Sequence, residues 1–416
     1  MSFSIAQMAK DARKASFSVA NLSTAQKDAA LTAMAQKLIE RTELILTENQ
    51  KDLDAGKQNG LTDAMIDRLR LTPERVKDLA NALIEVTTLP DPVGTVSDLK
   101  IRPNGMRVGR MRIPLGVIAM IYEARPNVTA EAAALCLKSG NAVVLRGGKE
   151  ALFSNLVIAK CLHEALVEQN IDPNAICVVP DPDRAIMNEL MTLSDDIDLI
   201  IPRGGEGLIR FVTENSRIPV IQHFKGVCHL YIDQDADNKM ALDLLLNGKT
   251  QRTGVCNALE TLLVHQAQAD SFLPIAAKAL AEKGVKIHAC EKSIGYFAGA
   301  ELATEDDWHA EYLALEIAVR IVDDFDAAIS HLESYSSGHT EVICTQSYQS
   351  ANEFTRRVNS AVVMVNASSR FSDGGQLGLG AEIGISTSKL HAYGPMGLES
   401  LTTQKFIVQG EGQIRP

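Results

Sequence analysis

The amino-terminal part of the chain carries the hydrophobic pattern of helices. Between residues 29 and 39, apolar side chains recur at spacings of three and four, with polar residues between them. This spacing puts the apolar side chains on one face of a helix. Ser23 stands just before the run, where its hydroxyl can cap the first turn. We therefore predict helices from residue 1 to about residue 90.

From about residue 114 the pattern changes to short apolar runs rich in β-formers, separated by stretches of helical length. This alternation is typical of an α/β fold. The first series of predicted strands is 116–122, 142–145, 175–179, 197–201 and 220–221. The second series is 261–264, 285–288, 319–322, 342–344 and 362–365, with helices at 270–282 and 326–333. The two series predict two α/β units that divide near residue 250.

Residues 94–113 alternate between charged and apolar side chains and lead into Pro114. The alternation predicts a two-stranded ribbon. Because an isolated ribbon of two strands is only marginally stable in water, we expect it to pack on another element. The candidates are a terminal strand at 405–408 and a second subunit.

Composition narrows the function classes. The chain has 416 residues, enough for two or three compact units. It carries 41 Lys and Arg against 52 Asp and Glu, a net charge of −11. This balance disfavours non-specific binding to nucleic acid, but it leaves room for a local basic pocket that holds a phosphorylated ligand.

The cysteines and the amino terminus indicate a compartment. The seven cysteines are scattered and form neither a CxxC pair nor a Cys/His metal spacing, which predicts a reducing compartment and no metal site. The amino terminus lacks the features of a signal peptide, and no apolar stretch approaches the length that spans a membrane. We therefore expect a cytoplasmic protein without a membrane partner.

Cys256 is the candidate nucleophile. It lies between a helical pattern and the apolar strand predicted at 261–264, with the cations Lys249 and Arg252 nearby in sequence. Nearby cations stabilise a thiolate, and Gly254 removes bulk beside the backbone. The alternative is an inert cysteine at the start of a strand.

Two glycine pairs follow predicted strands. Arg203-Gly204-Gly205 follows the strand at 197–201 and precedes a helical pattern, and Arg146-Gly147-Gly148-Lys149 follows the strand at 142–145. Such a turn presents backbone N–H groups and a helix start to a phosphate. Neither pair is a GxGxxG fingerprint, so each taken alone is more typical of a tight turn. Two such turns in one α/β series favour a nucleotide.

Several separated stretches together carry a resemblance. They are 121–129, 201–205, 250–257, 328–341, 366–375 and 391–397. Through them the chain resembles, essentially end to end, the gamma-glutamyl phosphate reductases, a family within the aldehyde dehydrogenase superfamily. The resemblance implies an aldehyde-dehydrogenase-like α/β fold. It implies a Rossmann-like NADPH-binding domain at 1–93 and 114–250, an α/β catalytic domain at 251–385, and a small β oligomerisation flap at 94–113 and 400–416.

The resemblance also implies an activity, that of a phosphorylating glutamate-5-semialdehyde dehydrogenase. The expected reaction is NADPH-dependent reduction of L-glutamate 5-phosphate to L-glutamate 5-semialdehyde with release of phosphate, the second step of proline biosynthesis from glutamate. The expected chemistry is attack by the Cys256 thiolate on the acyl phosphate, which gives a thioester that hydride then reduces. A homo-oligomer is expected, and a glutamate 5-kinase could act as a partner.

Site residues follow from the same resemblance. The oxyanion of each tetrahedral intermediate needs donors, for which the Cys256 backbone N–H and the Asn127 amide are candidates. The alternative for Asn127 is a helix cap or turn. His223 stands where oxidising relatives carry a water-activating glutamate, which suits a reductase, although a purely structural histidine remains the alternative.

The cofactor side is predicted in the same way. Arg146 and Lys149, with Gly147 and Gly148 between them, favour the 2′-phosphate of NADPH, whereas NAD-preferring relatives carry a carboxylate there. Glu311 matches the glutamate that holds the nicotinamide ribose in relatives.

The substrate is doubly charged and needs cationic partners. The candidates are Arg125, Arg203, Arg252 and Arg370, each of which could equally form a structural salt bridge. His331 and His339 belong to the shared signature but receive no derived role, and their spacing is no metal-site pattern. Thr253 and Gly248 depart from the proline and alanine common in the family, which concerns the rigidity of the loop before Cys256.

Three other functions stay open at this point. A hydrolase or acyl-transferase could pair Cys256 with a histidine base such as His223, but it would leave the glycine turns unexplained. A non-catalytic binding protein could keep the fold. An oxidising aldehyde dehydrogenase is disfavoured by the missing glutamate.

Overall fold

The computed structural model describes residues 3–415, which form two compact units. Unit 1 contains the chain up to Gln222, together with Leu379–Gly384 and the chain from Met396 onward. Unit 2 contains His223–Gly378 and Ile385–Pro395. The units therefore divide the chain at residue 222, not near residue 250 as predicted. The reason is that residues 228–250 form a strand and a helix that belong to the sheet of unit 2.

The helical prediction for the amino-terminal part is confirmed. The helices are α1 (Ile5–Val19), α2 (Thr24–Glu40), α3 (Thr42–Gln58), α4 (Asp63–Leu69) and α5 (Pro73–Thr88). Ser23 caps α2 as predicted: its hydroxyl oxygen accepts from the Gln26 N–H at 3.3 Å, and the Gln26 side chain accepts from the Ser23 N–H at 2.9 Å. This reciprocal pair satisfies two N–H groups that a helix start leaves unpaired.

Unit 1 is built on a four-stranded parallel sheet of order β5-β4-β3-β6. Its elements are β3 (Val117–Tyr122), α6 (Asn127–Lys138), β4 (Ala142–Gly147), α7 (Leu152–Glu168), β5 (Ile176–Val178), α8 (Arg184–Leu190), β6 (Leu199–Arg203) and α9 (Glu206–Asn215). The strand order changes direction between β3 and β6. Open α/β sheets bind ligands at such a point, beside the carboxyl ends of the strands. The strand predicted at 220–221 is wrong: Val220 forms only an isolated bridge to Ile200 in the described structure. Pro219 has no N–H with which to extend the pairing.

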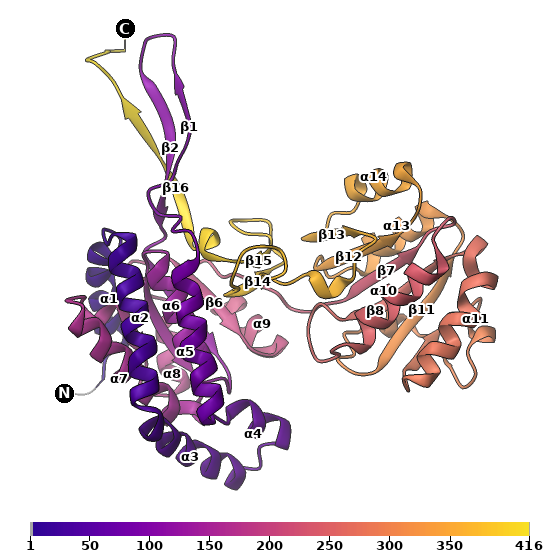
Figure 1. Cartoon of the computed structure of the whole chain (residues 1–416), viewed down its shortest axis with the longest axis horizontal. Coiled ribbons are helices and arrows are strands. Elements are labelled where there is room, and N and C mark those ends of the chain that lie inside the picture. Colours follow the sequence, from indigo (N-terminus) through magenta and orange to yellow (C-terminus); the bar gives the residue numbers. More distant parts are fainter. Residues whose placement is uncertain (1–2, 416) are drawn as a thin grey trace. The chain divides into compact units, whose positions relative to one another are not determined.

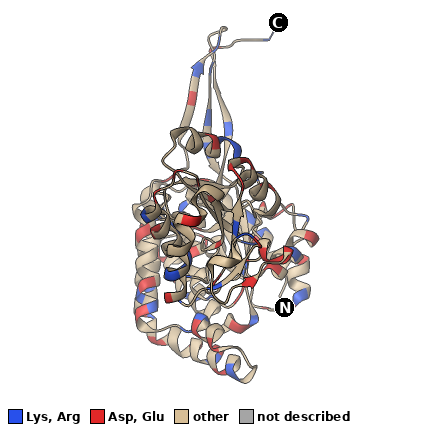
Figure 2. Ribbon diagram, turned by 90° about the vertical axis from the view of Figure 1, so that its right-hand side faces the viewer, with Lys and Arg blue, Asp and Glu red and all other residues tan. Residues whose placement is uncertain are grey.

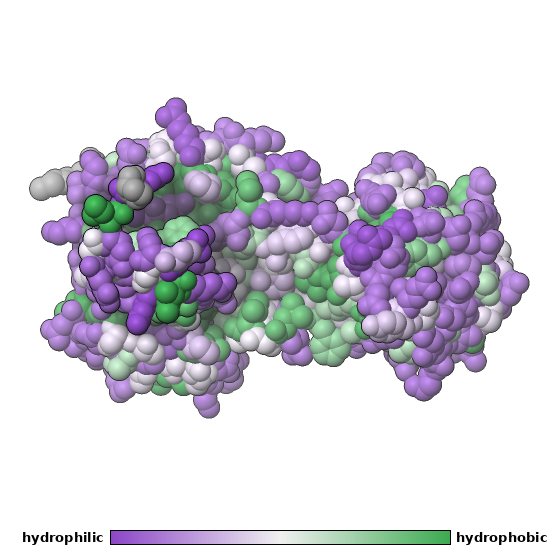
Figure 3. All heavy atoms as spheres, turned by 90° about the horizontal axis from the view of Figure 1, so that it is seen from above, coloured by the Kyte–Doolittle hydropathy of each residue, from purple (hydrophilic) through white to green (hydrophobic). Residues whose placement is uncertain are grey.

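The predicted ribbon is present. Of the two predicted packing partners, a terminal strand and a second subunit, the terminal strand pairs with it. β1 (Val96–Ile101) and β2 (Arg107–Pro114) are antiparallel, and β16 (Thr402–Gln409) pairs with the other edge of β2. Figure 1 shows this three-stranded sheet projecting from the helices of unit 1. Apolar side chains remain exposed on its outer strands: Val96, Leu99, Ile101, Phe406 and Val408. In the view from above, apolar residues interrupt the polar surface of unit 1 (Figure 3).

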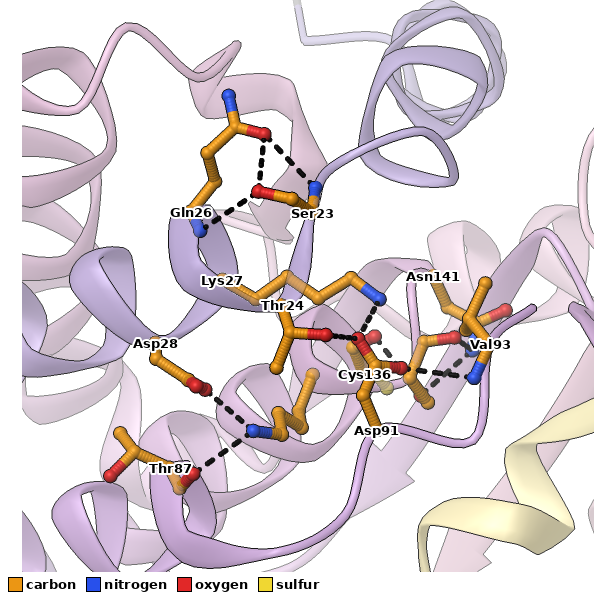
Figure 4. A network of polar contacts seen from close by, with 12 residues as sticks. Ser23, Thr24, Gln26, Lys27, Asp28, Thr87, Asp91, Val93, Cys136 and Asn141 are labelled. Carbon is orange, nitrogen blue, oxygen red and sulfur yellow. Dashed lines mark hydrogen bonds and ion pairs between the residues drawn. The ribbon is translucent and has the colours of Figure 1, made fainter. Parts of the chain in front are cut away.

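Two buried lysines fasten helices of unit 1 together (Figure 4). The Lys27 ammonium lies 2.8 Å from the Asp91 carboxylate, which also accepts from the Val93 N–H at 2.9 Å. The Lys138 ammonium binds Asp28 at 2.5 Å and the carbonyl of Thr87 at 3.1 Å. Both ammonium groups lie on side chains with no exposed surface. These contacts tie α2, α5 and α6 to the segment that enters the ribbon.

Unit 2 contains a seven-stranded sheet of order β10-β9-β11-β8-β7-β12-β13, in which all described pairs are parallel. The strands are β7 (Cys228–Ile232), β8 (Leu259–His265), β9 (Lys286–Ala289), β10 (Glu301–Leu302), β11 (Glu316–Val322), β12 (Thr340–Cys344) and β13 (Val362–Val365). One face packs on α10 (Asn238–Thr250) and α11 (Gln266–Glu282). The other packs on α13 (Phe325–Tyr335) and α14 (Tyr348–Arg357). The five predicted strands of the second series are confirmed, whereas β7 and β10 were not predicted.

Short elements complete the chain. They are α12 (Glu305–Trp308), β14 (Gly384–Ser386) and β15 (Gly394–Met396). Acidic and basic residues are interspersed along the helices (Figure 2). Within residues 3–415, no helix is both long and apolar enough to cross a bilayer.

Candidate active site

Cys256 lies in the segment between α10 and β8, and its side chain is partly exposed. The backbone of Gly226 lies directly against it. A Cβ atom at position 226 would come within 2.7 Å of the Cys256 Cα and closer still to its carbonyl oxygen. Glycine is therefore required at position 226 by the approach of two backbones. At Gly254, by contrast, an added Cβ would meet no atom within 4 Å.

Two histidines accompany Cys256. One ring nitrogen each of His223 and His339 lies with the Cys256 Sγ in a group whose atoms are all within 4.8 Å of one another. The two imidazole centroids are 5.0 Å apart. The sheet explains why they meet: Cys256 precedes β8, His223 precedes β7, and His339 precedes β12. Because β8, β7 and β12 are parallel neighbours, the segments before them converge at the amino edge of the sheet.

His339 is held in one tautomer. Its Nδ1 lies 2.7 Å from the Thr340 hydroxyl, which in turn donates to the Ser372 hydroxyl at 2.8 Å. The Thr340 oxygen therefore accepts from Nδ1–H, and Nε2 carries the lone pair. Burial, followed by the nearby His223, lowers the pKa of His339 to about 3, so the ring is neutral. Among the described residues, its buried Nε2 has no hydrogen-bond partner.

Cys228 lies close to Cys256 but is not a nucleophile. It is fully buried, and its thiol donates to the Cys256 carbonyl oxygen at 3.2 Å. Burial, together with the charge of Glu341, raises the pKa of the Cys228 thiol well above its ordinary range. The thiol therefore stays protonated and serves to hold the Cys256 backbone.

Two arginines lie near Cys256. Arg370 donates through Nε to the Gln251 side chain at 2.8 Å, while its buried Nη1 has no hydrogen-bond partner among the described residues. Burial lowers the pKa of Arg370, and the neighbouring Arg252 lowers it further, whereas a Cys256 thiolate raises it. The contact with Gln251 places Arg370 beside the segment that carries Arg252 and Cys256, so three of the predicted site residues lie in one region.

The segment around Cys256 is tied to the segment that carries Arg370. The Asn257 side chain donates to the Ser372 carbonyl at 2.9 Å, and the Ser369 hydroxyl donates to the Asn257 carbonyl at 2.7 Å. Glu311 also lies here, because its carboxylate accepts from the Gly226 N–H at 3.0 Å. Its predicted role toward a ribose stays a prediction.

Lys249 was predicted to stabilise the Cys256 thiolate, but the structure pairs it with another group. Its buried ammonium lies 2.5 Å from the Glu260 carboxylate and donates to the Leu259 carbonyl at 2.8 Å. Burial lowers the pKa of Lys249 and raises that of Glu260 to about 7. The charge of Lys249 is therefore largely offset by Glu260. Local sequence could not reveal this partner.

The other predicted residues lie in unit 1, at the carboxyl ends of its strands. Arg146 and Gly147 end β4, Gly148 and Lys149 follow, and Arg203 ends β6 before Gly204 and Gly205. Arg146 donates to the Pro182 carbonyl at 2.7 Å, and its buried Nε has no hydrogen-bond partner among the described residues.

Two carboxylates in these turns were missed by sequence reasoning. Glu123 accepts from the Gly205 N–H at 3.0 Å, and Glu150 accepts from the Ala124 N–H at 2.6 Å. An added Cβ at Gly204 or Gly148 would collide with the side chain of Glu123 or Glu150, respectively. Because both carboxylates end flexible side chains that can shift, these contacts alone do not require glycine at either position.

Asn127 begins α6, and its amide donates to Glu131 at 3.1 Å. This contact is the local helix contact expected of a structural residue, and its catalytic role stays a prediction. Arg125 precedes α6 in the same turn, and its substrate role likewise stays a prediction.

Residues 3–293 match the aldehyde dehydrogenase family. The chain is 60% identical over 414 residues to the gamma-glutamyl phosphate reductase of Colwellia psychrerythraea, with 99% of each chain covered. It is 62% identical over 413 residues to that of Idiomarina loihiensis, covering 98% of this chain and 99% of the relative.

The same family appears among solved structures. The crystal structure of gamma-glutamyl phosphate reductase from Thermotoga maritima matches with a TM-score of 0.97 and 44% identity, covering 99% of this chain and 100% of that chain. These matches confirm the predicted α/β fold of aldehyde dehydrogenase type. The chain therefore belongs to the aldehyde dehydrogenase family, and within it to the gamma-glutamyl phosphate reductases.

Proposed function

We propose that this chain reduces L-glutamate 5-phosphate to L-glutamate 5-semialdehyde with NADPH and releases phosphate, as the second step of proline biosynthesis from glutamate. The relatives described above are named for this reduction. The observation that carries the proposal is that the partly exposed thiol of Cys256 shares its segment of unit 2 with Arg252, and that Arg370 binds the same segment through Gln251. A nucleophile beside two cations suits an anionic acyl phosphate.

In the proposed reaction, the Cys256 thiolate attacks the acyl carbon. The carbon–oxygen bond to phosphate breaks, phosphate leaves with the electron pair, and a thioester forms on Cys256. Arg252 and Arg370 would hold the phosphate or the carboxylate, since guanidinium groups bind both in a bidentate manner. The His223 imidazole beside the thiol offers a site for its proton, and neither His223 nor His339 supplies a carboxylate to activate water.

The cofactor is proposed to bind unit 1. NADPH, when bound, supplies the hydride that reduces the thioester to the aldehyde and frees the thiol. The strand order with its reversal between β3 and β6 fits a dinucleotide, as do the two turns that lead from strand to helix. The unpartnered Nε of Arg146 and the exposed Lys149 fit a 2′-phosphate. Members of the aldehyde dehydrogenase family use NAD or NADP.

Other assignments stay part of the proposal. Asn127 remains the candidate second oxyanion donor, Arg125 and Arg203 remain candidate substrate ligands, and Glu311 remains the candidate ribose ligand. The three-stranded sheet, with its exposed apolar side chains, is assigned to contacts in a homo-oligomer. The seven free cysteines fit a reducing cytoplasm. A glutamate 5-kinase is the partner that could hand over the acyl phosphate.

The thioester gives a direct test. Protein incubated with glutamate 5-semialdehyde and NADP, without phosphate, is digested and analysed by mass spectrometry. We expect a glutamyl adduct on the peptide that contains Cys256, absent in Cys256→Ser and unchanged in Cys290→Ser, whose cysteine is also partly exposed. An adduct that survives Cys256→Ser would refute the assignment of the nucleophile.

The nearness of His223 to Cys256 also favours a second candidate, a cysteine hydrolase with a histidine base. Such an enzyme would hydrolyse the acyl phosphate without any nicotinamide. Release of phosphate at equal rates with and without NADPH would support it.

A further inference from the structure

Cys256, His223 and His339 form a cluster, here called the Cys–His–His cluster. Its side chains are of types that bind metal ions. Each contributes one donor atom, and the three atoms lie within 4.8 Å of one another. Thiolate sulfur and imidazole nitrogen are the donors that zinc prefers. No spacing in the sequence reveals the set, because its members precede three different strands.

His339 is prepared as a ligand. Its Nδ1–H is used by the Thr340 hydroxyl, which is itself fixed by Ser372. Zinc-binding histidines are oriented by this kind of outer hydrogen bond on the ring nitrogen that does not bind the metal. The other nitrogen, Nε2, is buried and has no hydrogen-bond partner among the described residues. A buried lone pair without a partner is costly unless something binds it.

We propose that the Cys–His–His cluster binds a zinc ion reversibly, through the Cys256 Sγ and one ring nitrogen each of His223 and His339, and that the bound metal holds the enzyme inactive. Binding breaks the Sγ–H bond of Cys256 and releases its proton to solvent, and no electron is transferred. The sulfur electron pair that would attack a carbonyl is then bonded to the metal. Water completes the fourth position of a tetrahedral site.

The geometry requires only a small adjustment. Zinc–nitrogen and zinc–sulfur bonds of about 2.1 and 2.3 Å separate the ligand atoms of a tetrahedral site by roughly 3.4–3.7 Å. The atoms here are at most 4.8 Å apart, so each pair closes by about 1.4 Å or less. His223 can supply this movement, because it lies in a segment outside helices and strands.

Cobalt binding tests the proposal without any enzyme assay. CoCl2 is titrated into the full-length protein, kept reduced with a phosphine that does not compete for metal, and followed by absorption. We expect a thiolate-to-cobalt charge-transfer band with intense tetrahedral d–d bands at one equivalent, both removed by one equivalent of ZnCl2. Absence of the charge-transfer band would overturn the proposal.

Variants identify the ligands. Cys256→Ser should abolish the charge-transfer band, and His339→Gln and His223→Asn should each weaken binding at least 100-fold. Since His339 is buried, circular dichroism must show that its variant folds, and the more exposed His223 provides an independent test. Cys290→Ser and His309→Gln, which alter a cysteine and an exposed histidine of the same unit, should bind like the wild type. Unchanged affinity in both ligand-histidine variants would contradict the site.

The claim that bound zinc inactivates the enzyme is tested separately. ZnCl2 should block nicotinamide-dependent turnover at the concentration that displaces cobalt, and EDTA should restore it fully. Zinc that binds without inhibiting would overturn the claim of inactivation. If the protein shows no turnover at all, the proposed function fails, while the cobalt titration still decides whether the metal site exists.

Discussion

Arg370 carries a guanidinium group that the surrounding fold only partly uses. Its Nε binds Gln251, but its buried Nη1 has no hydrogen-bond partner among the described residues. Replacement by lysine keeps a charge but removes the planar fork that binds an oxyanion. We predict that Arg370→Lys raises the KM for phosphate in the reverse reaction about 10-fold or more, a loss of about 1.4 kcal/mol or more.

The control for Arg370 is an arginine with no such role. Arg356 lies on α14 and is paired with Glu353 at 2.5 Å on the same exposed face. Arg356→Lys should leave the KM for phosphate within twofold of the wild-type value. Equal KM values for phosphate in the two variants would remove Arg370 from the site.

Gly226 tests how closely the Cys256 backbone must be held. Gly226→Ala places a methyl group against the Cys256 backbone, so one of the two segments must move. Since misplacement of a reacting group by about 1 Å can cost about 100-fold, we predict a loss of kcat of that order. Gly254→Ala, two residues from Cys256 but facing open space, should retain most of its kcat. A similar loss in both variants would mean that backbone approach is not the cause.

Single residues also show where sequence reasoning stops. Cys256 is predicted as the nucleophile from the cations and Gly254 in its own segment together with the family resemblance, and this role stays a prediction. His339 received no role, because its neighbours Cys256 and His223 come from distant segments that only the strand order joins. Lys249 was predicted to stabilise the thiolate, but its ammonium group forms an ion pair with Glu260. Contacts of long range in sequence cannot be inferred from local pattern.

At the level of elements, the buried pair of Lys27 and Asp91 stabilises the helical layer of unit 1. Asp91→Ala leaves the Lys27 ammonium buried without its carboxylate. Removing one partner of a buried ion pair costs about 3–5 kcal/mol, so we predict a fall of that size in the free energy of unfolding. Urea denaturation followed by circular dichroism measures it.

A surface pair serves as the control for Asp91. Lys239 and Asp243 lie 2.7 Å apart on α10, and both are strongly exposed. Exposed pairs contribute about 1 kcal/mol or less, so Asp243→Ala should shift stability by no more than that. If Asp91→Ala cost no more than Asp243→Ala, the network in Figure 4 would not stabilise the fold.

Most elements could be predicted from periodicity, and the exceptions have physical reasons. β7 was missed because His229 and Tyr231 interrupt its apolar pattern, although every residue of the strand is buried. His229 is accommodated by Glu341, whose carboxylate lies 2.9 Å from its Nδ1. β10 has two residues, too few for a pattern. Because β7 was not predicted, the boundary between the two units was predicted near residue 250 instead of at residue 222.

At the level of the whole molecule, stability should depend on pH through His331 in unit 2. Burial lowers the pKa of His331 to about 2, with smaller effects of His229 and Arg320. Arg320 lies 3.0 Å from its Nδ1, a nitrogen that must stay unprotonated to accept. The folded chain therefore keeps His331 neutral, while the unfolded chain protonates it below its ordinary pKa of about 6.5.

The sign of the effect follows from linkage. A lowered pKa in the folded state gives stability that is present above pH 6.5 and is lost as the pH falls toward 2. From pH 7 to pH 5 the loss is up to about 2 kcal/mol. We predict that the urea midpoint falls over this range and that His331→Asn reduces the slope. A slope unchanged in His331→Asn would contradict the assignment.

The whole account depends on a thioester that phosphate, not water, resolves. The decisive measurement is the reverse reaction: protein, glutamate 5-semialdehyde and NADP, with and without phosphate, followed by the absorbance of NADPH. The account predicts NADPH formation that requires phosphate and disappears in Cys256→Ser. Equal turnover without phosphate would contradict it, because water would then resolve the thioester, and full turnover in Cys256→Ser would remove the thioester altogether.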